Sequence, residues 1–557
     1  MKPRVVNSRL RLLLLIILLT FAALGARAAW IQTVRASSLT SLAQRQAKAA
    51  LVLPAGRGTI YDRLGTPLAI GEQATDVVAD PLQISDPLHE ARIAAKVLDL
   101  PVKPVYRKLS DRSRGFVYVQ RKAPTERAAA LVKRKLPGFT FEADERRVYP
   151  QDTVAAPVLG YAGIDNTGLA GLELELNKEL SGTPGSATVV RDALGQAVNT
   201  IQNRPAHAGR DVFLTLDSHM QANAEQVLAQ TVGQWHAKSA TAIVLDPHTG
   251  AILAMAQEPG YNANGFPQAT QHGLTVDHAV NDVFEPGSVF KVVTIGGALS
   301  EHKVTPQTAF TLPYSIHVAD RVIHDAETRP TERLTVAQIL QRSSNVGAIT
   351  IAERYLGETG LKKWMTRFGF GRRTGVDFPR ESQGLLPSYW SGSTIGNVPI
   401  GQGVSVTSIQ LASAYAAIAN GGVWIEPHLV DHVLGGRPSG LHRHRVLTPD
   451  VDYELRRMLQ GVVSDQGTAQ LAAIPGYTVA GKTGTAQKPG RYGYIPGAYV
   501  ATFVGMVPAL HPRLVVLVSV DQPRGGIYGG IVAAPAFEQI ASFDLQYLEV
   551  PPDLKIR

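Results

Sequence analysis

Hydrophobic positions in the second half of the chain form two kinds of pattern. Short apolar or β-branched runs bounded by Gly and Pro predict buried strands at 241–246, 251–255, 477–480, 499–507 and 514–520. The first two runs are joined by the turn residues 247–250 and therefore predict a hairpin. Between this hairpin and the late strands, helical spacing covers 290–299, 336–355 and 408–420. The order of strands, then helices, then strands predicts an α+β domain in which an antiparallel sheet carries helices on its faces.

The N-terminus carries a single long apolar run. Residues 12–25 are almost wholly apolar, and four basic residues precede them: Lys2, Arg4, Arg9 and Arg11. Basic residues stay on the cytoplasmic side of a membrane segment, so everything after the run is predicted to be exported. Two interpretations stay open: an uncleaved transmembrane anchor with Arg27 at the interface, or a signal peptide cleaved at the small-x-small sequence 26–28. A polar, Ala- and Gln-rich helical stalk is predicted at 33–48.

Between the apolar run and about residue 208, the pattern changes to short strands and turns. Residues 57–69 predict a strand, a Gly turn and a second strand, and 80–138, rich in Lys, Arg and Ala, predict short helices. No catalytic constellation occurs here, so we predict a β-rich pedestal domain. The expected organisation is a cytoplasmic tail and membrane anchor (1–30), a pedestal (31–208) and a catalytic domain (209–557).

Composition narrows the function classes. Of the 557 residues, 45% are hydrophobic and 18% are charged, which is typical of a globular protein with large cores. The net charge of +9 comes without any run of five Lys or Arg, so nucleic acid is not expected as a partner. The chain has no cysteine, which excludes disulfides, thiolate metal sites and a cysteine nucleophile. His442 and His444 lie in a Gly- and Arg-rich loop and are not predicted to bind a metal.

The first candidate for chemistry is the sequence Ser288-Val289-Phe290-Lys291, which follows a Pro-Gly turn. The apolar pattern after the turn predicts a helix, which places Ser288 at its N-terminus and Lys291 one turn later on the same face. A serine hydroxyl needs a base, and a lysine amine becomes one only when its pKa falls far below the reference value of about 10.4. Burial and the positive end of a helix dipole both lower that pKa, and free N–H groups at a helix start can stabilise an oxyanion.

A second stretch has the same serine–lysine spacing. Ser300 and Lys303 are also three residues apart, but Ser300 falls at the end of the helical pattern, just before Pro306. The serine would have no free N–H groups around it and the lysine would be hydrated. We therefore interpret this stretch as structural.

The second candidate is Ser343-Ser344-Asn345, beside the predicted helix 336–355. A hydroxyl and an amide two residues apart can reach the same cleft, so Ser343 could pass on a proton and Asn345 could hold a substrate amide. The alternative is an ordinary Ser/Asn helix cap, the commoner use of these residues.

The third candidate is Lys482-Thr483-Gly484-Thr485, directly after the predicted strand 477–480. Gly484 would let a substrate backbone approach the strand edge closely. Lys482 and the two threonines would recognise a carboxylate, and the Thr485 backbone N–H could complete an oxyanion hole. The alternative is a solvated turn lysine.

The ordered set of three motifs resembles the penicilloyl-serine transferase signature. The chain as a whole is similar to the class B penicillin-binding proteins, which are monofunctional peptidoglycan transpeptidases. The likeness in the catalytic half rests on 282–291, 343–347, 401–403 and 480–488. In the pedestal it rests on Arg57-Gly58 with Asp62 and Gly65, Arg147 with Tyr149-Pro150, and 168–173.

The resemblance implies a role for each motif residue. Ser288 would attack the penultimate D-alanine carbonyl of a stem peptide and release the terminal D-alanine, with Lys291 as the base. Ser343 and Lys482 would relay the proton, and the backbone N–H groups of Ser288 and Thr485 would form the oxyanion hole. Asn345 would orient the peptide, while Thr483 and Thr485 would bind its carboxylate. An amine from a neighbouring strand would resolve the acyl-enzyme, β-lactams would trap Ser288 as an ester, and no metal or organic cofactor is implied.

Within this family the compact size and the segments 368–371 and 401–403 favour the division-specific type over the elongation type, which stays open as an alternative. The resemblance then implies a single-pass protein of the cytoplasmic membrane with its catalytic domain outside. Its partners would be an FtsW-like polytopic glycosyltransferase and other division proteins.

Three other functions share these motifs. A serine β-lactamase or β-lactam sensor would need a deacylating Glu-x-x-Leu-Asn loop, but after Ser343 only 353–357 approaches that pattern, too early and ending in Gly. A D,D-carboxypeptidase would use water in place of the acceptor amine. A non-catalytic scaffold would not need Ser288, Lys291 and Lys482. The anchor and the pedestal favour the transpeptidase.

Overall fold

The computed structural model describes residues 4–38, 48–191, 197–271, 273–436, 440–491 and 493–554. Most of the predicted stalk, 39–47, lies outside these residues. The N-terminal helix α1 (Arg4–Thr33) continues through Arg27, whose guanidinium lies 5.0 Å from the ring centroid of Trp30. Within α1, Ser8–Thr33 has the length and composition of a single membrane span. The helix is therefore longer than the predicted apolar run.

By internal contacts the chain divides into two compact units. The first comprises Met1–Gly56 with Gly182–Ala208, and the second comprises Arg57–Ser181 with Gly209–Arg557. Besides α1, the first unit contains an antiparallel sheet in the order β1-β8-β9: β1 (Lys48–Leu53), β8 (Gly185–Arg191) and β9 (Ala197–Arg204). The boundaries expected at 31–208 and 209–557 stay predictions.

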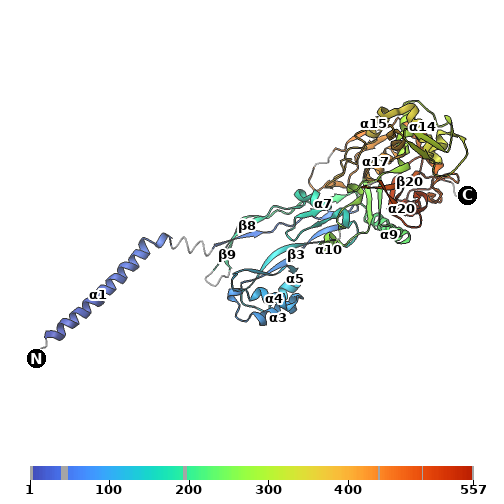
Figure 1. Cartoon of the computed structure of the whole chain (residues 1–557). Helices are drawn as coiled ribbons and strands as arrows, with labels where there is room; N and C mark the ends of the chain where they lie inside the picture. Colours follow the sequence, from blue (N-terminus) through green and yellow to red (C-terminus); the bar gives the residue numbers. More distant parts are fainter. Residues whose placement is uncertain are drawn as a thin grey trace. The chain divides into compact units, whose positions relative to one another are not determined.

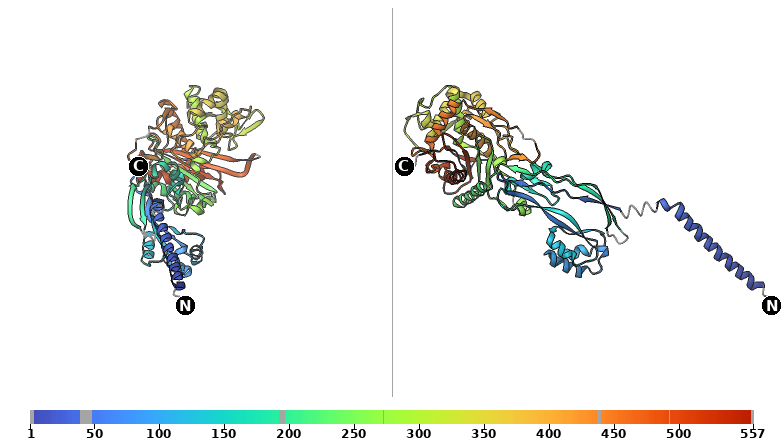
Figure 2. Two further views of the ribbon diagram at one scale, coloured as in Figure 1. Left: turned by 90° about the vertical axis from the view of Figure 1, so that its left-hand side faces the viewer. Right: turned by 180° about the vertical axis from the view of Figure 1, so that it is seen from behind.

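The N-terminal part of the second unit contains a six-stranded sheet in the order β18-β10-β2-β3-β4, with β5 also paired to β3. Its strands are β2 (Ile60–Tyr61), β3 (Pro67–Ala79), β4 (Val117–Pro124), β5 (Phe139–Val148), β10 (Val212–Leu214) and β18 (Val430–Val433). The predicted short helices are α3 (Pro87–Leu98), α4 (Val102–Leu109) and α5 (Thr125–Val132). They gather in one lobe, which Figures 1 and 2 show. The lobe has its own apolar core. Strand β4 within this stretch was not predicted.

A buried ionic cluster ties the pedestal motifs together. Glu173 is fully buried and receives Arg57 and Arg147, each at 2.6 Å. The Tyr149 hydroxyl donates to the same carboxylate at 3.4 Å. Two guanidiniums around one buried carboxylate offset the desolvation of all three side chains, so the three separated sequence motifs converge on one structural centre.

The catalytic half is built on a five-stranded antiparallel sheet in the order β12-β11-β22-β21-β20, which confirms the predicted arrangement. The strands are β11 (Ser239–Leu245), β12 (Ile252–Glu258), β20 (Ala480–Gly490), β21 (Gly493–Val507) and β22 (Leu514–Asp521). The first two form the expected hairpin. Strand β20 begins only at Ala480, so the prediction of a strand at 477–480 that ends before the third motif was wrong.

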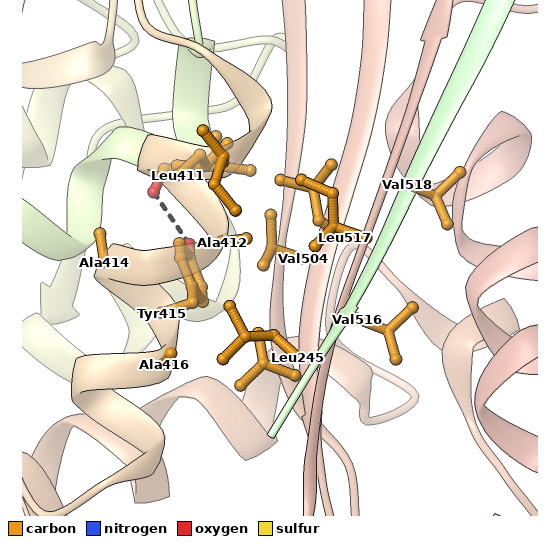
Figure 3. Close-up of a cluster of buried hydrophobic side chains, with 14 of the residues drawn as sticks. Leu245, Leu411, Ala412, Ala414, Tyr415, Ala416, Val504, Val516, Leu517 and Val518 are labelled. Carbon is orange, nitrogen blue, oxygen red and sulfur yellow. Dashed lines mark hydrogen bonds between the residues drawn. The ribbon is translucent and has the colours of Figure 1, made fainter. Parts of the chain in front are cut away.

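Helices cover both faces of this sheet. On one face lies α17 (Ser408–Ala419), whose Tyr415 packs beside Val504 and Leu517 (Figure 3). Val516 and Val518 point to the opposite face (Figure 3), because side chains alternate along a strand. On that face α9 (Ser218–Trp235) packs with α20 (Ala534–Tyr547), whose Phe537 ring lies 4.8 Å from that of Phe503.

The remaining elements surround these two sheets. They are α6 (Ala156–Leu159), β6 (Tyr161–Ala162), β7 (Gly168–Ala170), α7 (Gly171–Glu175), α8 (Asn177–Leu180), α10 (Phe266–Gln271), α11 (His278–Asn281), α12 (Lys291–Ser300), β13 (Ala309–Leu312), β14 (Ser315–Val318), β15 (Arg321–His324), β16 (Glu332–Thr335), α13 (Val336–Gln341), α14 (Asn345–Ile351), α15 (Gly357–Arg367), α16 (Thr394–Asn397), β17 (Val423–Ile425), β19 (Arg443–Arg445), α18 (Pro449–Gln460) and α19 (Gly529–Val532). The helix predicted over 336–355 is interrupted at 342–344, at the second motif.

Candidate active site

The nucleophile segment is a tight 3-10 turn, Gly287–Phe290, that leads into α12. Ser288 lies in this first turn, as predicted, and is partly exposed, whereas Val289 and Phe290 are buried. Gly287 has a φ of +59° and donates its N–H to the carbonyl of Gly401 at 3.0 Å. A Cβ on Gly401 would lie 2.1 Å from the Gly287 oxygen, so only glycine permits this approach. The close backbone contact fixes the turn that presents Ser288.

Lys291 is fully buried on the first turn of α12. Its Nζ donates to the Ser343 carbonyl at 2.5 Å, to Asn345 Oδ1 at 2.7 Å and to Ser343 Oγ at 3.2 Å. Burial lowers the pKa of Lys291 to about 7, and the negative charge of Asp325 opposes that shift. Near neutral pH a large fraction of this amine is therefore uncharged and able to accept a proton. Among the described residues, the Ser288 hydroxyl itself forms no hydrogen bond.

The second motif contains a helix cap, one of the two possibilities that the sequence left open. Ser344 is the N-cap of α14, and its Oγ accepts the Gly347 N–H at 3.0 Å. Its neighbours Ser343 and Asn345 instead face Lys291. Ser343 has a φ of +58°, which is left-handed backbone for a non-glycine residue, and this turn aims both its oxygens at the amine.

The third motif lies inside β20, next to the nucleophile turn. Lys482 is fully buried, and its Nζ contacts the Thr483 carbonyl at 3.2 Å and the Thr483 hydroxyl at 3.3 Å. Burial and then the positive charge of Lys291 hold the pKa of Lys482 well below its usual value. A Cβ on Gly484 would lie 2.8 Å from the Pro286 carbonyl oxygen, so β20 runs against the turn that carries Ser288. Thr485 accepts the Gly529 N–H at 3.2 Å.

The three motifs therefore meet in one place. Lys291 bonds to the second motif, its charge acts on the third, and β20 packs on the nucleophile turn. Ser300, by contrast, is the last residue of α12, and Lys303 is exposed, as expected for a structural stretch. A serine, a buried amine with a lowered pKa and two sets of polar groups, arranged in this way, suit acyl transfer.

Sequence reasoning missed two groups around this site. Glu285 is buried, accepts the Gly403 N–H at 2.9 Å and receives the Tyr494 hydroxyl at 2.9 Å. Asp325 accepts the Ser344 hydroxyl behind the second motif. A carboxylate directly before Pro286-Gly287 was the only available signal for the first group; no local signal marked the second.

Three tyrosines follow the third motif in the sequence, and two histidines lie in the Gly- and Arg-rich loop. Tyr494 binds Glu285, Tyr499 pairs with Gln487 on the sheet, and Tyr492 lies outside the described residues. His442 and His444 pack beside Trp424. Within the described part of the chain, no group of three or more His, Asp or Glu side chains has metal-site geometry.

Two family descriptions match the chain. Residues 240–542 match the penicillin binding protein transpeptidase domain, and residues 52–214 match the penicillin-binding protein dimerisation domain. The Neisseria meningitidis protein named probable peptidoglycan D,D-transpeptidase PenA is 32% identical over 99% of this chain and 94% of its own length. The Escherichia coli protein named peptidoglycan D,D-transpeptidase FtsI is 31% identical over 98% of this chain and 93% of its own length.

Solved structures give the same relationship. Penicillin-binding protein 3 from Mycobacterium tuberculosis, in complex with ampicillin, superposes with a TM-score of 0.72 at 30% identity, covering 91% of this chain and 98% of the other. A peptidoglycan synthetase from Bifidobacterium adolescentis gives a TM-score of 0.74 at 27% identity, covering 92% of this chain and 98% of the other.

Proposed function

Since the chain belongs to the family of penicillin-binding protein transpeptidases, we propose that it is a serine peptidoglycan D,D-transpeptidase and that Ser288 is its nucleophile. The observation that carries the proposal is the fully buried Lys291, with its lowered pKa, one turn beyond Ser288 and bonded to the second motif. A lysine whose pKa lies near neutral pH can take up the proton of a serine hydroxyl.

In the acylation step the Ser288 hydroxyl gives its proton to Lys291 Nζ as its oxygen bonds to the penultimate D-alanine carbonyl. The backbone N–H groups of Ser288 and Thr485 stabilise the oxyanion. Collapse of the tetrahedral intermediate breaks the amide bond, and the departing D-alanine amine receives a proton through Ser343 and Lys482. The acyl group is then transferred to an amine of a neighbouring stem peptide, whose proton returns to Ser288 by the same route.

The other residues of the second and third motifs recognise the substrate. Asn345 orients the peptide amide, and Thr483 and Thr485 bind the terminal carboxylate of the donor. Gly484 lets β20 lie directly against the nucleophile turn, because any side chain there would press on the Pro286 carbonyl and on Val289. The same contacts suit the carboxylate and strained amide of a β-lactam, so penicillins are expected to acylate Ser288.

Three further parts of the proposal concern the cellular setting. The helix α1 anchors the protein as a single pass, with basic residues at its N-terminus inside and the catalytic domain outside the cytoplasmic membrane. Relatives named FtsI and PbpB support a role in septal rather than lateral wall synthesis. An FtsW-like glycosyltransferase and other division proteins are the partners expected for that role.

The test is intact-protein mass spectrometry after exposure to benzylpenicillin, followed by peptide mapping. We expect one adduct on Ser288, none in Ser288→Ala, and an unchanged adduct in the matched control Ser300→Ala. An adduct on Ser300, or none on the wild-type protein, would contradict the proposal. Rapid release of the adduct would instead support a β-lactamase.

A further inference from the structure

The second motif is held from behind by the segment that follows strand β15. Asp325 is 8% exposed, and its carboxylate accepts the Ser344 hydroxyl at 3.1 and 2.9 Å and the Val346 N–H at 3.0 Å. The preceding residue contributes a backbone contact, because Asn345 Nδ2 donates to the His324 carbonyl at 2.9 Å. Three consecutive residues after Ser343 are thus fixed by two residues of a distant hairpin.

Arg329 fixes the carboxylate of Asp325 in turn. Its guanidinium reaches Asp325 Oδ2 at 2.6 and 2.9 Å and also donates to the carbonyls of Leu312 and Pro313, at 2.9 and 3.1 Å. The pair is almost wholly withdrawn from solvent, with side-chain exposures of 15% for Arg329 and 7% for Asp325. Removal of one partner from a buried charge pair is strongly unfavourable, because it leaves the other charge buried and uncompensated.

The geometry at stake is the turn at Ser343. Its left-handed backbone, with a φ of +58°, is unfavourable for a non-glycine residue and persists only when its surroundings hold it. This turn is also what presents the Ser343 carbonyl and hydroxyl to Lys291. Release of Ser344 and Val346 would let the turn relax and withdraw both oxygens from the amine.

We propose that Asp325, paired with Arg329, is a positioning residue of the reaction: it holds the Ser343 turn against Lys291 and places a compensated negative charge beside the catalytic amine. This inference rests on the proposed function of Ser288 and Lys291. Asp325 acts indirectly: it holds the second motif in place, and its negative charge acts on the Lys291 amine.

The charged groups near Lys291 predict how its pKa changes when each of them is removed. Asp325 faces the amine from the hairpin side, with Arg329 behind it, and Lys482 faces it from β20. Asp325 opposes the lowering of the Lys291 pKa, so removal of its charge should lower that pKa further. Arg329 also lies 3.5 Å from Glu332, so removal of the Arg329 charge takes the cation away from both carboxylates and should raise the Lys291 pKa. The two substitutions therefore act in opposite directions.

The experiment measures the acylation rate of the whole protein by a fluorescent penicillin between pH 5 and 9. Four variants are compared with the wild type: Asp325→Asn, Arg329→Gln, Ser344→Ala and the matched control Asp320→Asn, whose carboxylate is exposed on the same hairpin. The acid limb is the pH range over which the acylation rate falls as the pH is lowered. We expect the midpoint of this limb to move to lower pH in Asp325→Asn and to higher pH in Arg329→Gln, each by about half a pH unit or more. Ser344→Ala should lower the plateau without moving the limb, and Asp320→Asn should match the wild type.

A merely structural role for Asp325 would lower the melting temperature and the amount of active protein, but it would not move the limb. Limbs that stay in place, or that move in the same direction in Asp325→Asn and Arg329→Gln, would overturn the inference. If Asp325→Asn does not fold, the inference is tested by Arg329→Gln alone, in which the midpoint of the acid limb should move to higher pH. A wild-type protein with no Ser288 adduct would instead refute the proposed function.

Discussion

The contact between β20 and the nucleophile turn can be tested with one methyl group. Gly484 has ordinary backbone angles, so alanine costs nothing there in conformation, but its Cβ would lie 2.8 Å from the Pro286 oxygen and 3.1 Å from Val289 Cγ1. Ordinary contact begins at 3.4 Å, so the strand and the turn must separate by about 0.6 Å. The atom that must yield is backbone oxygen, which cannot rotate away.

A displacement of this size matters because the oxyanion hole is predicted to draw one N–H from each side of that contact. Misplacement of reacting groups by about 1 Å costs about a hundredfold in rate, so Gly484→Ala should slow Ser288 acylation about tenfold to a hundredfold. Stopped-flow measurement of penicillin acylation gives the rate, and circular dichroism gives the melting temperature.

The matched control is Gly233→Ala, in α9, where a Cβ meets nothing within 4 Å. It should acylate at the wild-type rate and be slightly more stable, because alanine favours a helix. Wild-type acylation by a folded Gly484→Ala protein would refute the idea that this strand sets the geometry of the turn.

Three further predictions concern buried polar groups. Asp544 is buried, and within the described residues neither of its carboxylate oxygens has a hydrogen-bond partner. Burial raises the pKa of this carboxyl group. The folded protein is therefore more stable at low pH, where Asp544 is protonated, and loses this stability as the pH rises. Asp544→Asn should therefore raise stability at pH 8 by about 1–3 kcal/mol, with the gain vanishing towards pH 4, and equal denaturation midpoints at pH 8 would contradict this. Glu173→Gln leaves Arg57 and Arg147 without their buried carboxylate and should cost about 3–5 kcal/mol in urea unfolding; a loss below 1 kcal/mol would rule out the ionic centre. Tyr494, near the turn of the β20–β21 hairpin, donates its hydroxyl to Glu285, and Tyr494→Phe should slow acylation about fivefold. An unchanged rate would mean that this end of the hairpin does not support the nucleophile turn.

The chemistry was predictable from sequence because its first step is local. The spacing of Ser288 and Lys291 puts both on one helical turn, and the Pro-Gly pair before them marks where that turn starts. The antiparallel sheet was equally accessible, because β11, β12, β21 and β22 are apolar and bounded by turn residues.

Strand β20 was misplaced because its own residues argue against it. Residues 480–490 are rich in Gly, Lys and Thr, and Gly and Lys are depleted in strands. Pairing with β21, from Ala480 opposite Met506 onward, overrides that preference. Gly484 is needed for the close approach to the nucleophile turn, which no local pattern reveals.

The break at the second motif was hidden by apolar periodicity that continues across it. Residues 336–355 read as one helix, yet the left-handed Ser343 ends α13 and the Ser344 cap begins α14. The group that holds this break, Asp325, directly follows the β14–β15 hairpin and lies 19 residues before Ser344. Contacts of that kind depend on tertiary structure and leave no trace in local spacing.

The central claim is that burial lowers the pKa of Lys291 to about 7, so that the amine acts as a base near neutral pH, and the pH dependence of Ser288 acylation tests it most directly. Rates of adduct formation, with the site confirmed by peptide mapping, should rise with pH through a single ionisation near pH 7 and stay level above it. A rate that keeps rising beyond pH 9, towards the value of about 10.4 for a hydrated lysine, would contradict a buried uncharged amine at this position.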